Sequence, residues 1–387
     1  MSDHQILDVA VLGAGQAGLA VAAALGRRQV SAVVLERSTV GATWRGHYDR
    51  LTLNTDRLLS ALPGRPLPRR HGRWVSRDAF VDYLEGCAGE LDVRTGVETL
   101  RLDRQGEVWA LRGTRFRARR VIVATGRNRV PLTPRWPGRF HGPVSHSAAY
   151  RNPTPYAGQV VLVVGAGNSG AEIAADLVAA GPAGARHVLL SARQLPGLLP
   201  RTIGPVPTQL AAFGLPVVPA ALADRAARAA LEVLRPHDRA RGLPAPATLV
   251  SAARQGRPPV LDNGLRAAVH AGRVTIVAAV TGLDGWRVHL ADGTSVTPDA
   301  IITATGWRAN LEPLVGHLGV LDAHGLPLLQ AGGEAAPGLH FLGFRAALTG
   351  EVHGAGHDAE QLAASLTGAG RVRAAVNGVR RRLPLPA

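Results

Sequence analysis

The sequence contains no lysine, and all 44 of its basic residues are arginine. Against 28 acidic residues this gives a net charge of +16, which taken alone would favour a nucleic-acid partner. A nucleic-acid-binding face normally uses both basic residue types, and these arginines are scattered along the chain. We therefore attribute the charge to a compositional bias of the genome and expect no nucleic-acid partner, although the positive field would favour anionic cofactors.

Cysteine and long apolar runs are almost as scarce. Cys87 is the only cysteine, which excludes an intramolecular disulfide, a CxxC redox pair and a thiolate metal cluster. The apolar runs are far shorter than the roughly 20 residues needed to cross a bilayer, and the N-terminus shows no charged-then-apolar leader. We expect a cytoplasmic protein without membrane contact. His353 and His357 have ligand-like spacing but lack carboxylate or thiolate partners, so we predict loop histidines near a cofactor and no metal site.

The length of 387 residues favours two domains. Residues 6–12 form an apolar run interrupted only by Asp8. "GAGQAG", a helical stretch and the largely apolar "SAVVLER" follow, which together make a βαβ unit. The same order recurs over 159–193. The pattern predicts an α/β fold with two Rossmann-like dinucleotide-binding domains of the three-layer ββα type. We expect residues 1–155 and 299–387 to form the first domain, with 156–298 inserted as the second.

Each glycine-rich loop follows a buried strand and opens a helix, the context that makes GxGxxG a dinucleotide fingerprint. Gly13 permits a tight turn, Gly15 lets backbone approach a pyrophosphate, and Gly18 lets helix and strand pack closely. The pyrophosphate would lie at the helix N-terminus, where unpaired N–H groups favour anions. Gly165, Gly167 and Gly170 repeat the arrangement.

The residues after the second strand of each unit distinguish the two ligands. Glu36 ends "SAVVLE" and would accept hydrogen bonds from ribose hydroxyls while repelling a 2′-phosphate, which suits FAD or NAD. The corresponding residue of the second unit is Ser191, with Arg193 two positions further on. Absence of a carboxylate and presence of a guanidinium favour NADPH over NADH there.

Two dinucleotide sites in one chain indicate a flavoprotein in which a nicotinamide delivers hydride to a flavin. Disulfide reductases share this plan, but they require a cysteine pair beside the flavin. With one cysteine present, oxygen becomes the leading electron acceptor.

A third motif precedes the second glycine loop: Phe140, Gly142, His146 and Tyr150 match F-x-G-x(3)-H-x(3)-Y. Together with "GATWRGHYDRLTLNT", "VIVATGRN", "RPPVLDNG" and "GLHFLGF", it makes the chain resemble the flavin-containing monooxygenase superfamily (class B flavoprotein monooxygenases), most closely its YUCCA-like branch.

The resemblance implies FAD and NADPH as cofactors, with Asn54 as the catalytic residue against the reactive flavin edge. His146 would couple nicotinamide binding to the geometry of the two domains. The cofactor-binding residues would be Gly13, Gly15, Gln16, Ala17, Gly18, Glu36, Arg37, Trp44, Thr125, Gly126, His146, Gly165, Gly167, Asn168, Ser169, Gly170, Ser191, Arg193, Thr305, Gly306 and Gly343.

The resemblance also implies an NADPH-dependent FAD monooxygenase that forms a C4a-(hydro)peroxyflavin and transfers one atom of O₂ to a small organic substrate. A nitrogen or sulfur centre, a carbonyl and a 2-oxo acid all stay open as the oxidised group, and a role in specialised metabolism and a homodimer are expected. The alternative is an NADPH:flavin oxidoreductase that passes electrons to a protein partner or to oxygen without oxygenating a substrate. A non-enzymatic scaffold or RNA-binding protein is suggested by the charge alone.

Overall fold

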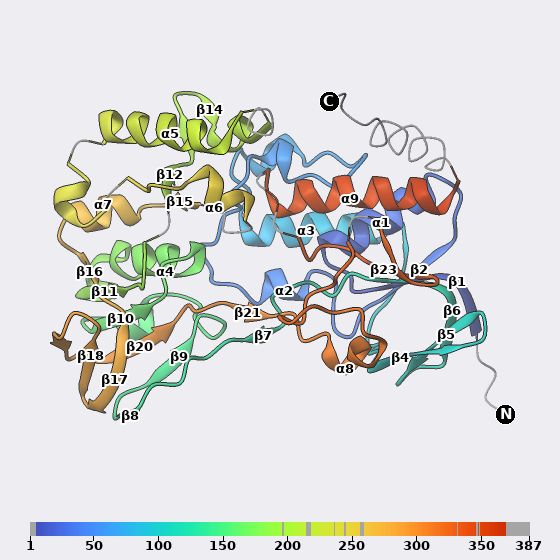
Figure 1. Ribbon diagram of the computed structural model, residues 1–387, viewed down its shortest axis with the longest axis horizontal. Helices are drawn as coiled ribbons and strands as arrows, with labels where there is room; N and C mark the ends of the chain where they lie inside the picture. Colours follow the sequence, from blue (N-terminus) through green and yellow to red (C-terminus); the bar gives the residue numbers. More distant parts are fainter. Residues whose placement is uncertain are drawn as a thin grey trace, which may run out of the picture.

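The computed structural model describes residues 5–195, 197–213, 218–235, 237–243, 245–255, 259–330, 332–345, 347 and 349–368. Its architecture is built on two largely separate sheets. Figure 1 shows the first sheet at one end of the long axis and the second at the other, with β7 (Val130–Pro131) and β21 (Trp307–Arg308) running between them. These two short strands pair with each other in antiparallel register.

The first sheet draws its strands from both ends of the chain, in the order β22-β23-β6-β1-β2-β3. All neighbours along β23, β6, β1, β2 and β3 pair in parallel, and β22 pairs with β23 in antiparallel fashion. An antiparallel meander of β4 and β5 joins the sheet through β6. The strands are β1 (Gln5–Leu12), β2 (Ala32–Leu35), β3 (Asp92–Arg94), β4 (Arg101–Gln105), β5 (Val108–Arg112), β6 (Phe116–Val123), β22 (Glu334–Ala336) and β23 (Leu339–Phe341).

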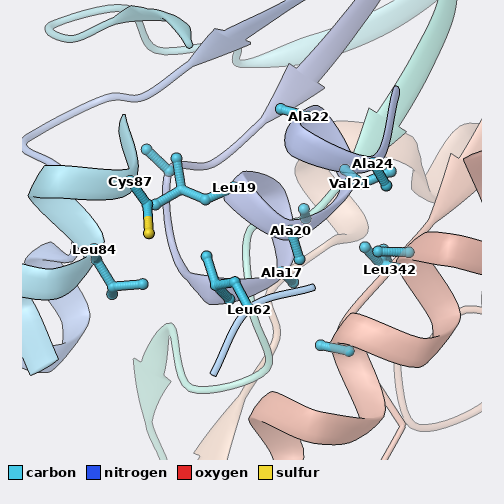
Figure 2. Packing of buried hydrophobic residues seen from close by; sticks show 14 of the residues in the cluster. Ala17, Leu19, Ala20, Val21, Ala22, Ala24, Leu62, Leu84, Cys87 and Leu342 are labelled. Carbon is cyan, nitrogen blue, oxygen red and sulfur yellow. The ribbon is translucent and has the colours of Figure 1, made fainter. Parts of the chain in front are cut away.

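Side chains of β1 alternate between two cores, as the two-residue period of a strand requires. Val9 and Val11 pack with helices α1 (Gln16–Gly26), α3 (Arg77–Ala88) and α9 (Glu351–Leu366). Ala10 and Leu12 face the opposite core, which includes the β4–β5 meander and α8 (Glu312–Val315). Figure 2 shows the helix side, where Leu19 of α1 and the single cysteine, Cys87 of α3, lie in one buried apolar cluster.

The second sheet is parallel throughout, in the order β16-β11-β10-β20-β9. Alternate residues of β10 again face two layers. Val161 and Val163 pack with α4 (Asn168–Ala179) and α7 (Leu265–His270), whereas Leu162 and Val164 pack against an antiparallel sheet of β19, β18 and β17, to which β8 adds a parallel edge. The strands are β8 (Gly138–Phe140), β9 (Val144–His146), β10 (Val160–Val164), β11 (His187–Ser191), β16 (Val274–Val277), β17 (Val280–Gly285), β18 (Arg287–Leu290), β19 (Ser295–Val296) and β20 (Ala300–Thr303).

Both halves therefore have the three-layer ββα arrangement that the sequence predicts. The remaining elements connect or cover them: α2 (Ala42–Arg45), β12 (Leu198–Pro200), β13 (Thr202–Ile203), β14 (Val206–Pro207), α5 (Ala220–Leu234), α6 (Val250–Arg254) and β15 (Val260–Asp262). None of the helices in the described part of the chain is both long and apolar enough to span a membrane.

The expected loop placement of two histidines is wrong. His353 and His357 both lie on α9, where His353 Nδ1 is 3.0 Å from the Thr349 hydroxyl and His357 Nε2 is 2.8 Å from the Gln361 amide. The glycines of "EVHGAGH" suggest a loop, but the helix uses them for close packing, because a Cβ at Gly356 would lie 3.1 Å from the ring of Pro63.

Candidate active site

The two glycine loops have nearly identical geometry. Gly13 and Gly165 each adopt φ +107°, a left-handed conformation that side-chain-bearing residues rarely take. A Cβ at Gly18 would overlap the carbonyl oxygen of Gly13, and one at Gly170 would overlap that of Gly165. Neither α1 nor α4 has a side-chain cap at its N-terminus, so the first backbone N–H groups are left for an anion.

Glu36 is held in place beside the first loop. Its Oε2 accepts the Ala14 N–H at 2.8 Å, and its Oε1 accepts the Ser38 N–H at 2.9 Å. A carboxylate has about four lone-pair sites, so these two bonds leave acceptor capacity for ribose hydroxyls.

A cavity of about 410 Å³ opens at the carboxyl ends of the first sheet's strands. Among the sequence-predicted residues it is lined by Gly13, Gly15, Gln16, Ala17, Glu36, Arg37, Trp44, Thr125, Gly126 and Gly343. Trp44 is fixed there, because its Nε1–H donates to Gln16 Oε1 at 2.8 Å and its ring meets Phe80 edge-on at 4.9 Å.

Two buried hydroxyls of the cavity wall, Thr99 Oγ1 and Thr125 Oγ1, have no hydrogen-bond partner among the described residues. Buried polar groups are normally paired, so the pair of hydroxyls points to a polar ligand. The uncapped helix N-terminus, the acceptor at Glu36 and these hydroxyls all fit a flavin dinucleotide.

The second loop presents a different ribose environment. Arg193 is exposed, and no hydrogen bond or ion pair of its guanidinium is present among the described residues, which leaves it available to a phosphate. Ser191 is fully buried, and its hydroxyl donates to the Ala278 carbonyl at 2.8 Å, so it faces away from solvent. At the start of α4, Gly167 and Asn168 are exposed and Ser169 is half-buried. These features fit NADPH.

His146 of the F-x-G-x(3)-H-x(3)-Y motif links the end of β9 to the turn after β20. Its Nδ1 accepts the Ala148 N–H at 3.1 Å, so the ring proton is on Nε2, which donates to the Gly306 carbonyl at 3.1 Å. The hydroxyl of the neighbouring Thr305 donates to the Leu132 carbonyl. The ring of Trp307, which lines the first cavity, meets His146 edge-on at 5.1 Å. Burial lowers the pKa of His146, which favours this neutral form.

This neutral histidine predicts a pH dependence of stability. The unfolded chain binds a proton at His146 below its ordinary pKa of 6.5, whereas the folded chain binds it only at lower pH, so the free energy of unfolding falls as the pH drops through 6.5. Glutamine can make both hydrogen bonds without titrating. When the pH is lowered from about 7.5 to about 5.5, we expect the melting temperature of His146→Gln to fall less than that of the wild type. Equal losses in both proteins would exclude His146 as a contributor.

Residues 48–54, which follow α2, are hydrogen-bonded to helix α4, which packs on the second sheet. Asn54 Nδ2 donates to Glu172 Oε1 at 2.7 Å, and the Tyr48 hydroxyl donates to Glu172 Oε2. One turn further along α4, Asp176 accepts Arg50 Nη1 at 3.0 Å and the Tyr150 hydroxyl at 2.7 Å. Asn54 therefore lies where the two halves meet, and it is not one of the residues that line the cavity.

The charges in this contact are perturbed by burial. Burial raises the pKa of Glu172, although the hydrogen bonds from Tyr48 and Asn54 oppose the shift. Burial raises the pKa of Tyr48 as well, and the Glu172 carboxylate adds to that effect. Burial lowers the pKa of Arg201, whose Nη2 donates to the Leu53 carbonyl and whose guanidinium carbon lies 4.1 Å from the Trp74 ring centroid.

Sequence reasoning missed part of this site. Arg127 and Asn128 directly follow the first "ATG", and Trp307 follows the second, so adjacency to those motifs was an available signal. His47 lies within the quoted "GATWRGHYDRLTLNT", which was a signal of the same kind. The other missed residues carry no local signal, because only the fold brings them to the cavity or to Asn54: Thr99, Arg129, Arg151, Glu351, Glu172, Arg201 and Gln209.

Comparison with known proteins agrees with this geometry. The flavin-binding monooxygenase-like family matches residues 115–316, and a pyridine nucleotide-disulphide oxidoreductase family matches residues 10–189. The chain is 36% identical to indole-3-pyruvate monooxygenase YUCCA1 of Oryza sativa subsp. japonica over 78% of this chain and 77% of that protein. It is 30% identical to probable indole-3-pyruvate monooxygenase YUCCA7 of Arabidopsis thaliana over 86% and 82% of the two chains.

Among solved structures, a flavin-containing monooxygenase from Stenotrophomonas maltophilia superposes with a TM-score of 0.70 at 26% identity, covering 94% of this chain and 99% of that one. Cyclohexanone monooxygenase, at 16% identity and a TM-score of 0.68, shares the fold. The chain has two dinucleotide-binding domains and belongs to the flavin-binding monooxygenase-like family, as an FAD- and NADPH-dependent monooxygenase.

Proposed function

We propose that this monooxygenase catalyses the oxidative decarboxylation of an aryl 2-oxo acid, with indole-3-pyruvate as the first candidate substrate. The observation that carries the proposal is the 36% identity, over 78% of the chain, to a protein named indole-3-pyruvate monooxygenase. In this reaction a 2-oxo acid, O₂, NADPH and a proton give the carboxylic acid shortened by one carbon, CO₂, NADP⁺ and water. One oxygen atom enters the acid, and the other leaves as water.

The polar surroundings of Asn54 support an acidic aryl substrate. Arg201 is a half-buried cation there, its buried Nε has no partner among the described residues, and its guanidinium stacks on Trp74. A guanidinium is well suited to a carboxylate, and an aromatic face to an aryl ring. We propose that these two side chains recognise the two ends of the substrate.

We also propose residue roles at the cofactors. Bound FAD would supply the oxygen-activating redox chemistry, and NADPH its two electrons. Gly13, Gly15 and Glu36 would hold the flavin dinucleotide, and Arg193 would bind the 2′-phosphate of NADPH. The amide of Asn54 would form a hydrogen bond at the reacting edge and slow the loss of oxygen as hydrogen peroxide.

The remaining expectations are part of the same proposal. Residues 1–155 and 299–387 would form the FAD domain, and 156–298 the inserted NADPH domain. The described residues end at 368, so the last part of this range lies outside them. We propose that the protein is cytoplasmic and forms a homodimer. Light scattering of the purified protein would test the homodimer.

The decisive experiment supplies indole-3-pyruvate to the FAD-loaded enzyme with NADPH under ¹⁸O₂. We expect NADPH consumption to depend on the substrate and indole-3-acetate to carry one ¹⁸O atom. Oxidation of an added thioether or tertiary amine, with no decarboxylation, would assign heteroatom oxygenation instead. Substrate-independent NADPH consumption that yields only hydrogen peroxide would favour the reductase alternative.

A further inference from the structure

Helix α4 carries a buried carboxylate that the cofactor roles above do not use. Glu172 is 6% exposed and lies one turn after Asn168, where the helix begins. Both of its oxygens are hydrogen-bonded by side chains from the other half of the molecule, Oε1 by Asn54 and Oε2 by Tyr48. Burying a carboxylate is costly, so its two specific partners require an explanation.

The Glu172 bond fixes which end of the Asn54 amide is available. Glu172 accepts hydrogen bonds at both of its oxygens, and the one at Oε1 comes from Asn54 Nδ2, so the NH₂ group of Asn54 faces Glu172. The carbonyl oxygen Oδ1 then points away from it, and this buried atom has no partner among the described residues. The main chain is held too, because Gln209 Nε2 donates to the Asn54 carbonyl.

An acceptor that the described part of the chain leaves unpaired is suited to a hydrogen-bond donor of a ligand. If the amide were free to rotate, it would offer its NH₂ group and its oxygen in turn. The hydrogen bond to Glu172 holds the Asn54 amide in one of these two orientations, and the hydrogen bond from Tyr48 keeps the Glu172 carboxylate from rotating. The outcome is a hydrogen-bond acceptor of fixed direction at the contact between the two halves.

We propose that Glu172 is a positioning residue for oxygen chemistry: it orients Asn54 so that Oδ1, rather than the amide nitrogen, faces the reacting groups. The inference rests on the proposed role of Asn54 and extends it. Because Glu172 belongs to the helix whose N-terminus fits the NADPH pyrophosphate, the orientation of Asn54 depends on how that helix is docked.

The test is a double-mutant cycle on the FAD-loaded full chain. It is read out as NADPH consumption in air without substrate, in which NADPH, O₂ and a proton yield NADP⁺ and hydrogen peroxide. Asn54→Ala and Glu172→Met should each accelerate this consumption about tenfold, and the double variant should match Asn54→Ala within about twofold. Glu172→Gln keeps an acceptor for Asn54 and should stay within about threefold of the wild type.

Asp176→Asn is the matched control, since Asp176 is buried on the same helix and bonds across the same contact, but not to Asn54. In the double variant with Asn54→Ala, the fold-changes of the two substitutions in NADPH consumption should multiply. If Glu172→Met does not retain flavin, Tyr48→Phe, which removes only the other bond to the carboxylate, replaces it in the cycle.

Two results would overturn the inference: effects of Glu172→Met and Asn54→Ala that multiply, or a Glu172→Gln variant that behaves like Glu172→Met. Anaerobic bleaching of the flavin by NADPH separates this failure from a failure of the proposed function. If the wild type shows no bleaching, the proposed function is wrong and the inference fails with it. If bleaching is normal, indole-3-pyruvate yields indole-3-acetate and the effects multiply, only the role of Glu172 is wrong.

Discussion

Gly18→Ala is expected to purify with little or no flavin. The added Cβ would overlap the carbonyl oxygen of Gly13, and the obstacle is backbone rather than a flexible side chain. Relief requires α1 to move away from the turn whose N–H groups would bind the pyrophosphate. Overpacking of this kind costs about 1–3 kcal/mol, so FAD affinity should fall by about 5- to 150-fold. The flavin absorbance per protein and a titration with added FAD measure it.

Gly26→Ala is the matched control, at the other end of the same helix. A Cβ there meets nothing within 4 Å, and alanine is the better helix former. We expect full flavin content and a stability equal to the wild type or higher by up to about 1 kcal/mol. A Gly18→Ala protein that is as yellow as Gly26→Ala would show that this loop does not hold the flavin.

Local pattern was sufficient to predict the fold. Helix α3 spans Arg77–Ala88, where Ser76 caps it and its apolar residues recur at helical spacing, so it can be recognised from the sequence. The segments "VIVATG" and "IITATG" have similar sequences, and the strands that they end, β6 and β20, pair in parallel with β1 and β10. These features depend on neighbours in sequence, and one chain is enough to see them.

The contact around Asn54 was not predictable in the same way. Asn54 and Glu172 are 118 residues apart, and each is an ordinary residue in its own segment. Their meeting depends on how α4 docks against the segment after α2, which no periodicity encodes. The sequence could place Asn54 by resemblance, but not the carboxylate that fixes its amide.

Helix α9 shows a different limit. Glycine has low helix propensity, so "EVHGAGH" predicts a loop. Tertiary packing decides otherwise, because Ala355 and Ala359 are buried against the cluster that includes α1 and the small glycines allow close approach. Ser191 shows the same limit. Its place at the end of the second strand suggests a residue that contacts the cofactor, and the sequence gives no sign that its hydroxyl is buried and donates to the Ala278 carbonyl.

Arg193→Ala is expected to raise the Michaelis constant for NADPH about tenfold and to leave that for NADH nearly unchanged. NADPH and NADH share the pyrophosphate and differ by the 2′-phosphate, so only a group that contacts this phosphate separates them. A charge-assisted hydrogen bond contributes about 1.5–3 kcal/mol, and the exposure of Arg193 places its contribution at the lower end through solvent screening. Steady-state kinetics with each cofactor would measure the two constants.

Arg287→Ala provides the control for loss of one positive charge, because Arg287 is exposed on β18, in a sheet that does not include β11. It should leave both Michaelis constants unchanged. In the wild type, added salt should weaken the binding of NADPH more than that of NADH, because salt screens the contact between Arg193 and the 2′-phosphate. Arg193→Ala should remove most of this difference in salt dependence. If Arg193→Ala raises both constants equally, the residue supports the loop rather than the phosphate, and the selectivity for NADPH must come from another group.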